Sequence, residues 1–199
     1  MANRVRFNGE LDDVLQFNDD GPRLCAVLFV DLNGFKSIND TFGHSAGDAV
    51  LRAVAERLRE SVLGSDLSAR LGGDEFAVLL TGLEDEAGAV AVARRISAAI
   101  HSPLLVAGQV LVPDSSIGVV VADPRACAAG VLLHRSDVAM YHAKRSRAPW
   151  VLYHSDLEMM SFARPGDEPP GPAWPRRRLD LQTEGGPDPG PLLTGGSRP

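Results

Sequence analysis

The sequence is poor in cysteine, in long apolar runs and in basic residues, and each shortage excludes a class of protein. With only Cys25 and Cys127, the 199-residue chain can build neither a disulfide scaffold nor a structural zinc site. No run of about 18 apolar residues occurs, and no apolar stretch follows the N-terminus, which excludes a membrane-spanning helix and a signal peptide. The net charge of -6 argues against general binding to nucleic acid or anionic membranes. We therefore expect a cytoplasmic protein with neither kind of partner.

Composition changes sharply after about residue 163. The 35 residues from Pro165 to Pro199 include nine prolines and seven glycines, and no periodic apolar face survives there. Such a segment cannot bury enough surface to offset its ordering entropy. Hydrophobic residues make up 44% of the chain, so the rest can build a core. We predict one folded domain over residues 1–163 and a disordered Pro- and Gly-rich tail over 164–199.

Within the predicted domain, apolar runs of strand length alternate with amphipathic helical patterns. After a first helix around Leu11–Leu15, we expect strands over Leu24–Val30, Leu67–Leu71, Phe76–Leu80, Leu104–Val112, Ser116–Ala122 and Trp150–Tyr153, and helices over Ala46–Glu60, Glu84–His101 and Ala129–Arg145. The second and third of these strands, separated by glycines, form one hairpin, and the fourth and fifth, separated by Pro113-Asp114, form another. This order predicts an α/β fold with a mixed central sheet flanked by helices.

Asp31 is the first polar residue after the apolar run Leu24–Val30. A carboxylate at the carboxyl end of a central strand lies where α/β folds place ligand and metal groups. An aspartate here also suits a helix N-cap, and this residue alone does not separate the two roles.

Two glycines and two acids, Gly72, Gly73, Asp74 and Glu75, join the strands of the first expected hairpin. Adjacent acids repel each other unless a cation or solvent screens them, and glycines let the backbone approach phosphate oxygens closely. A plain solvent-facing turn is the structural alternative. In combination with Asp31, the acids point to a Mg²⁺ site formed by carboxylates and substrate phosphates.

The hairpin segment RLGGDEF at 70–76 resembles the signature of the GGDEF domain, the diguanylate cyclase family. Further blocks of the family lie in the same order along the chain: DLNGFKSIND at 31–40, GHSAGD at 43–48, SIG at 116–118 and DVAMYHAK at 137–144. The resemblance covers about residues 3–153 and implies a nucleotidyl-cyclase-like fold. It also implies the condensation of two GTP molecules into cyclic di-GMP, with release of pyrophosphate.

The resemblance implies a role for each matched residue. Mg²⁺, with Mn²⁺ as the alternative metal, would be bound by Asp31, the Leu32 carbonyl, Asp74 and Glu75. Asp74 and Glu75 would be catalytic, Asp74 as the proton acceptor. GTP would be bound by Phe35, Lys36, Asn39, Asp48, Gly72, Gly73 and Lys144, the two lysines contacting phosphates.

Asn39 and Asp48 match the positions that bind guanine. The guanine edge offers N1–H and an exocyclic amine, which the Asp48 carboxylate can accept, while Asn39 supplies a donor and an acceptor. Helix capping is the alternative for both residues, and core packing is the alternative for Phe35. Because each domain of this family holds one GTP, the resemblance also implies a homodimer as the catalytic unit.

Three departures from the family pattern stand out. Of the block that usually opens the domain only Asn3-Arg4 and then Phe7 remain, which predicts a first helix prone to fray. In the family's product-inhibition motif, Arg-x-x-Asp, Leu63 replaces the arginine while Asp66 is kept, which predicts a degenerate site for cyclic di-GMP. The phosphate-binding arginine that follows Lys144 in the family is shifted by one residue, to Arg147, or lost.

A second function therefore stays open beside the cyclase. The segment Trp150–Asp156 resembles the lead into a phosphodiesterase domain of the EAL type, yet none follows in this sequence. A catalytically inactive GTP-binding regulatory module, or a gene fragment, is the alternative. Incubation with GTP and Mg²⁺ separates these hypotheses, since only the cyclase forms cyclic di-GMP.

Overall fold

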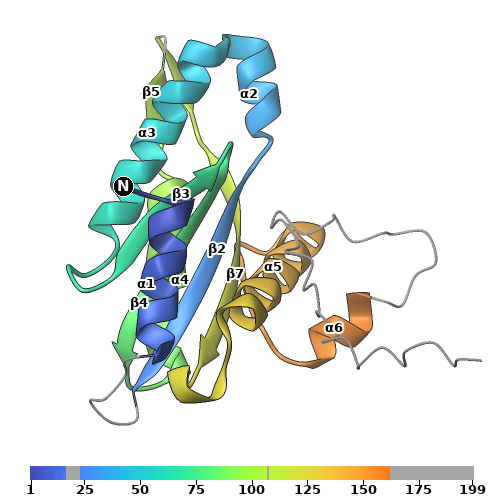
Figure 1. Cartoon of the computed structure of the whole chain (residues 1–199). Coiled ribbons are helices and arrows are strands. Elements are labelled where there is room, and N and C mark those ends of the chain that lie inside the picture. Colours follow the sequence, from blue (N-terminus) through green and yellow to red (C-terminus); the bar gives the residue numbers. More distant parts are fainter. Residues whose placement is uncertain (17–22, 107, 162–199) are drawn as a thin grey trace, which may run out of the picture. The chain divides into compact units, whose positions relative to one another are not determined.

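The computed structural model describes residues 1–16, 23–106 and 108–161, and the tail predicted over 164–199 lies outside them. A six-stranded sheet forms the centre of the fold, with strand order β1-β3-β4-β2-β7-β8 (Figure 1). Its strands are β1 (Ala2–Asn3), β2 (Leu24–Asn33), β3 (Leu67–Gly72), β4 (Glu75–Leu83), β7 (Asp114–Ala122) and β8 (Trp150–Leu152). The four central strands are antiparallel, and each edge strand runs parallel to its neighbour. This confirms the predicted mixed sheet.

Helices pack on both faces of this sheet (Figure 1). On one face α3 (His44–Glu60) and α4 (Glu86–Ile100) share the main core with alternate residues of β2, namely Ala26, Leu28, Val30 and Leu32. The intervening residues of β2, Asp31 among them, point to the opposite face, because side chains alternate along a strand. That face carries α1 (Arg4–Gln16) and α5 (Ala129–Ser146). Shorter helices are α2 (Phe35–Phe42), η1 (Pro124–Ala126) and α6 (Asp156–Ser161).

The hairpin predicted from Leu104–Val112 and Ser116–Ala122 is wrong. The first segment instead folds back on itself as β5 (Leu104–Val106) and β6 (Gln109–Leu111), a separate two-stranded sheet. Gly108 has a φ of +79°, a left-handed conformation that glycine adopts without strain, and this allows the chain to reverse. The second segment joins the main sheet as β7, beside β2.

The first helix is anchored, contrary to the expectation that it frays. Its N-terminal extension, β1, pairs with β3, and Arg4 Nε donates to the carbonyl oxygen of Leu71 at 3.1 Å. Phe7 and Leu11, two residues of this helix, have fully buried side chains. A short strand and one arginine therefore fix the start of α1.

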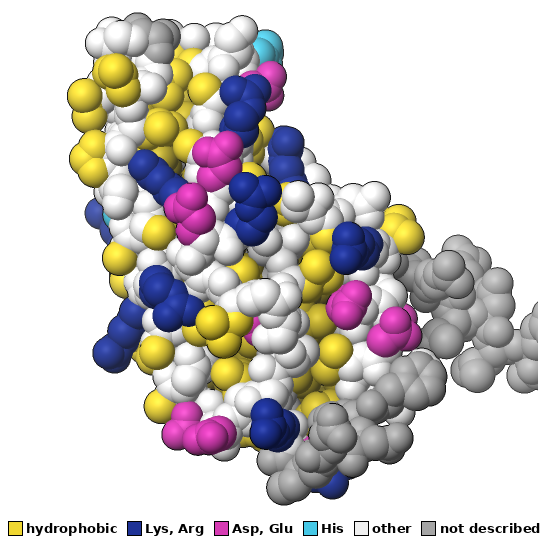
Figure 2. Space-filling model, turned by 90° about the vertical axis from the view of Figure 1, so that its left-hand side faces the viewer, with side chains coloured by type: hydrophobic (Ala, Val, Ile, Leu, Met, Phe, Trp, Pro, Cys, Tyr) yellow, Lys and Arg dark blue, Asp and Glu magenta, His cyan; other side chains and the backbone are white. Residues whose placement is uncertain are grey.

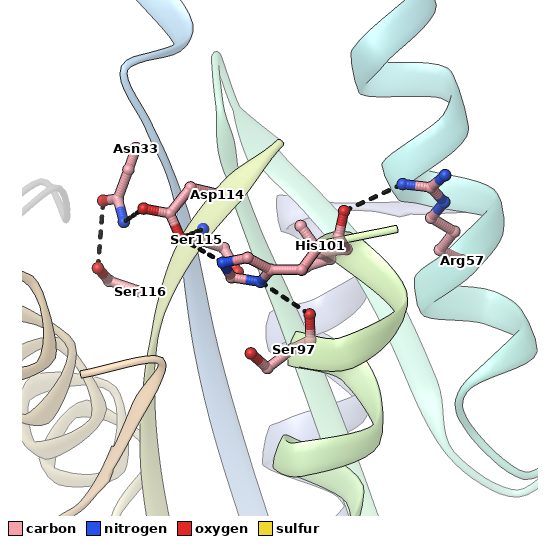
Figure 3. Close-up of polar contacts among 8 residues, drawn as sticks. Asn33, Arg57, Ser97, His101, Asp114, Ser115 and Ser116 are labelled. Carbon is pink, nitrogen blue, oxygen red and sulfur yellow. Dashed lines mark hydrogen bonds and ion pairs between the residues drawn. The ribbon is translucent and has the colours of Figure 1, made fainter. Parts of the chain in front are cut away.

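Two arginines tie the C-terminal ends of α3 and α4 together. Arg57 on α3 donates to the carbonyl oxygens of Ile100, Ser102 and Pro103 at 3.0, 2.8 and 2.9 Å (Figure 3 shows the first). In return, Arg95 on α4 donates twice to the carbonyl of Ser61, at 2.9 and 2.8 Å. The last carbonyls of a helix have no partner within it, so these cations satisfy them.

Arg57→Met is expected to lower the free energy of unfolding by about 1–3 kcal/mol, because three carbonyls lose their charged donor. Urea unfolding followed by circular dichroism measures the change. Arg59→Met is the matched control, since Arg59 lies exposed on the same helix. Equal losses in the two variants would show that the cap at Arg57 adds no stability.

Candidate active site

The segment from Gly72 to Glu75 forms the tip of the β3–β4 hairpin, as predicted. Gly73 and Asp74 make the turn, and the φ of +53° at Gly73 is a left-handed conformation that favours glycine. The Arg70 guanidinium donates twice to the carbonyl oxygen of Gly73, at 2.9 and 2.8 Å. The tip is therefore braced, and its two acids project from a fixed turn.

The sheet brings this tip to Asp31. In the β2–β4 register Asp31 pairs directly with Glu75, so the two carboxylates lie on the same face of the sheet. The backbone amide of Leu32 also donates to the carbonyl oxygen of Asp74 at 3.3 Å. β2 extends to Asn33, so Asp31 lies within the strand rather than just after it. Three of the predicted acids thus meet at one end of two neighbouring strands.

Two of these acids, Asp31 and Glu75, each form an ion pair with a basic side chain. Lys144 Nζ, from α5, lies 2.7 Å from Asp31 Oδ1. Arg4 Nη2 lies 3.5 Å from Glu75 Oε2, while Nε of the same guanidinium donates to the Leu71 carbonyl. Arg4 is a site residue that sequence reasoning missed, because its partners lie 67 and 71 residues further along the chain. Only its position in the family's opening block could have drawn attention to it.

Burial and neighbouring negative charges raise the pKa of Asp31 and of Glu75. Burial is the main cause of the raised pKa of both Asp31 and Glu75. The charge of Asp74 adds to the rise at both, and those of Asp31 and Asp137 add to the rise at Glu75. The two cations oppose these shifts, each at its own partner. The cluster therefore has an excess of negative charge that a further cation would relieve.

The residues present fit a divalent cation that substrate helps to bind. Within the described ranges, no group of three or more histidine, cysteine or acidic side chains is placed so that it could hold a metal ion. Mg²⁺ does not need one, since it is usually bound by one or two carboxylates together with substrate phosphates and water. Asp31, with Asp74 and Glu75 beside it, offers that oxygen set.

Asn39 and Asp48 come together where α2 meets α3. A Cβ at Gly47 would collide with the Oδ1 of Asn39, so the glycine lets α2 lie against α3 immediately beside Asp48. Asp48 is exposed, and no other described residue pairs with it. Phe35 is partly buried against the main core, which agrees with the packing alternative for this residue. Lys36 lies exposed on α2.

A cavity of about 480 Å³ lies beside Lys144. It is lined by Asn33, His101, Asp114, Ser115, Lys144, Arg147, Ala148 and Pro149. Arg147 ends α5 in a left-handed conformation, with a φ of +54°. The buried hydroxyl of Ser115 has no hydrogen-bond partner among the described residues. The two cations on the cavity wall, Lys144 and Arg147, favour an anionic occupant.

One wall of this cavity is a hydrogen-bonded network between β2, β7 and α4 (Figure 3). Asn33 Nδ2 donates to Asp114 Oδ2 at 3.0 Å, and Asn33 Oδ1 accepts from the Ser116 hydroxyl at 3.1 Å. The other carboxylate oxygen of Asp114 lies 2.6 Å from His101 Nε2. The network fixes the end of β2, two residues beyond Asp31.

At the degenerate product-inhibition motif, the structure gives Asp66 a local role. Its Oδ2 accepts from the backbone amide of Leu63 at 2.9 Å, and its Oδ1 accepts from the amide of Thr81 at 3.4 Å. The side chain of Leu63 is 69% exposed. Asp66 therefore closes the loop before β3 without any ligand.

Comparison with known proteins confirms the family. A family model described as "Diguanylate cyclase, GGDEF domain" matches residues 1–148. This chain belongs to the GGDEF domain family. Diguanylate cyclase TpbB of Pseudomonas aeruginosa is 42% identical over 146 residues, which cover 73% of this chain and 34% of TpbB. The chain thus spans about a third of the length of that relative.

Solved structures confirm the GGDEF fold. The crystal structure of the GGDEF domain of TpbB matches with a TM-score of 0.73 at 40% identity, covering 77% of this chain and 97% of that one. The GGDEF domain of DgcB from Caulobacter crescentus, solved in complex with c-di-GMP, matches with a TM-score of 0.70 at 26% identity. That match covers 77% of this chain and 90% of the DgcB chain.

The surface adds two observations on partners. On the face shown in Figure 2, Lys and Arg side chains are interspersed with Asp and Glu, and no extended basic field appears there. Among the described residues, no helix has the length and apolar character that crossing a membrane requires.

Proposed function

We propose that this GGDEF domain is one half of a diguanylate cyclase. It binds one GTP with Mg²⁺ and, facing a second copy, joins two GTP molecules into cyclic di-GMP. The meeting of Asp31 with the hairpin acids Asp74 and Glu75, beside Lys144, carries the proposal. This juxtaposition supplies carboxylates for a metal and a cation for phosphates at one place.

The cavity beside Lys144 suits the terminal phosphates of GTP. Lys144 and Arg147 supply positive charge there. Arg147 stands one residue before the family's phosphate-binding position, and its left-handed cap keeps it on the cavity wall. Once phosphates occupy the cavity, Lys144 can exchange its bond to Asp31 for one to a phosphate oxygen.

The proposed reaction is a phosphoryl transfer between two bound nucleotides. The 3′-oxygen of one GTP bonds to the α-phosphorus of the other, the bond from that phosphorus to the bridging oxygen breaks, and pyrophosphate leaves. Asp74 takes the proton of the 3′-hydroxyl. When bound, the metal neutralises charge that develops on the α-phosphate. Two such steps close the ring, so two domains must face each other.

Incubation of the protein with GTP and Mg²⁺, followed by mass spectrometry, tests the proposal. Cyclic di-GMP and pyrophosphate are the expected products. In the structure, Glu75 is already paired with Arg4 and Asp31 with Lys144. These pairs also allow the second candidate, a module that binds GTP without turnover. Tight GTP binding without product would support that candidate and contradict the cyclase.

Asp48→Ala is expected to weaken GTP binding by about 1–3 kcal/mol, because the guanine N1–H and amine lose their acceptor. ATP presents no matching donors, so the wild-type protein should prefer GTP and the variant should lose that preference. Calorimetry with both nucleotides in the presence of Mg²⁺ measures the difference.

Asp40→Ala is the matched control, since Asp40 is an exposed aspartate on the neighbouring α2. Its GTP affinity should equal that of the wild type. Equal affinities of the wild-type protein for GTP and ATP would show that Asp48 does not recognise the guanine base.

A further inference from the structure

Asp137, on α5, is a half-buried acid that has no role in the proposed reaction. No residue in the described part of the chain forms a hydrogen bond or an ion pair with its carboxylate. Removing a charge from water is costly unless the charge is paired. An unpaired carboxylate at this depth therefore favours a cation that arrives from solution.

A close helix–strand contact sets the position of this acid. A Cβ at Gly118 of β7 would collide with the backbone of Ser136 and Met140 on α5. The glycine thus lets the helix lie directly against the strand at the turn that carries Asp137. Gly118 pairs in turn with Phe29 on β2, two residues before Asp31.

The same stripe of α5 already reaches the site. Lys144 lies seven residues, or about two turns, after Asp137, so the two side chains share one face of the helix. Lys144 contacts Asp31 at 2.7 Å. α5 therefore carries a cation that contacts Asp31 and, two turns earlier on the same face, the acid Asp137.

The acids are also electrostatically coupled. Burial raises the pKa of Asp137, the charge of His134 opposes the rise, and the charge of Asp31 adds to it. Asp137 in turn contributes to the raised pKa of Glu75. The negative charge of Asp137 thus acts on Glu75, and that of Asp31 acts on Asp137.

We propose that Asp137 is a further residue of that site, which strengthens the binding of a hydrated divalent cation by Asp31 and Glu75. The inference rests on the proposed metal-dependent function. Mg²⁺ keeps several of its waters when bound, so a carboxylate outside the ligand set still attracts it and accepts hydrogen bonds from its hydration shell. Asp137 is a positioning residue, since it acts through the cation and not on the reacting atoms.

Asp137→Asn tests this role, because it removes the charge and keeps the shape. Titration of the protein with Mn²⁺ in the presence of a non-reacting GTP analogue, followed by electron paramagnetic resonance, should show Mn²⁺ affinity weakened about three- to tenfold. The melting temperature of the metal-free variant should stay the same or rise, because repulsion from Asp31 is removed. Asp12→Asn, at an exposed position on α1, is the control for losing one charge and should change neither quantity.

Asp31→Asn separates the inference from the proposed function. If Asp31→Asn weakens Mn²⁺ binding and Asp137→Asn does not, the inference about Asp137 fails while the metal site stands. If neither variant weakens binding, the metal site itself is wrong. A lower melting temperature of Asp137→Asn with unchanged Mn²⁺ affinity assigns the residue a purely structural role and also overturns the inference.

Discussion

Asp74→Asn is expected to reduce cyclic di-GMP formation about 100- to 10,000-fold, the range typical of losing a general acid or base. The variant cannot take the proton of the 3′-hydroxyl, and the site loses one negative charge beside the metal position. The assay is product formation from GTP and Mg²⁺, followed by mass spectrometry at equal protein concentrations.

The fold should survive this change. Asp74 lies half-buried at the hairpin turn, and its structural bond is made by its backbone carbonyl, which accepts from the Leu32 amide. Asparagine keeps that bond and removes a charge that repels Asp31 and Glu75. The melting temperature should therefore not fall.

Asp12→Asn serves again as the control for a neutralised aspartate, and it should retain full activity. Product formation by Asp74→Asn at the wild-type rate would show that this acid neither accepts the proton nor supports the metal. A large fall in melting temperature would instead assign Asp74 a structural role.

The local features of this site could be predicted from the sequence, because each has a local cause. The apolar run Leu24–Val30 ends at a polar residue, and this placed Asp31 near the carboxyl end of a buried strand, which in the structure continues two residues further, to Asn33. The glycines before Asp74 placed a tight turn between two strands, and the structure has that turn. In both cases the pattern needs only neighbouring residues, so the sequence carries it directly.

Contacts between distant segments could not be predicted in this way. β2 lies between β4 and β7, and nothing near Asp31 indicates which strands flank it. The ion pair between Arg4 and Glu75 joins residues 71 positions apart and leaves no local pattern. The run Leu104–Val112 has the length of one strand, and the reversal at Gly108 depends on a backbone angle that apolar periodicity does not report.

Cyclic di-GMP should not inhibit this protein at concentrations that inhibit relatives with an intact Arg-x-x-Asp motif. Leucine has no donor, whereas arginine can hold a phosphate or a guanine edge with two parallel hydrogen bonds. The loss of one charged hydrogen-bonding partner costs about 2–5 kcal/mol, which is some tens- to thousands-fold in affinity. Cyclase rates measured over a range of added cyclic di-GMP test the expectation.

The geometry around Asp66 agrees with this loss. Both of its carboxylate oxygens accept backbone amides, from Leu63 and Thr81, so the acid has a role in the loop that needs no ligand. A carboxylate alone also repels the phosphates of an anionic dinucleotide. Inhibition of the wild-type protein through a site away from the hairpin acids would contradict the loss.

Leu63→Arg is the sharpest test, because it restores the donor without disturbing the core. The Leu63 side chain is 69% exposed, so an arginine fits there and the backbone bond from its amide to Asp66 remains. We expect the variant to gain cyclic di-GMP binding by the same tens- to thousands-fold, measured by calorimetry. Leu63→Gln, which adds a polar group without a charged guanidinium, is the matched control, and its affinity for cyclic di-GMP should rise little. If Leu63→Arg gains no binding, the surface around Asp66 lacks the remaining contacts, and restoring the arginine is not sufficient to form the site.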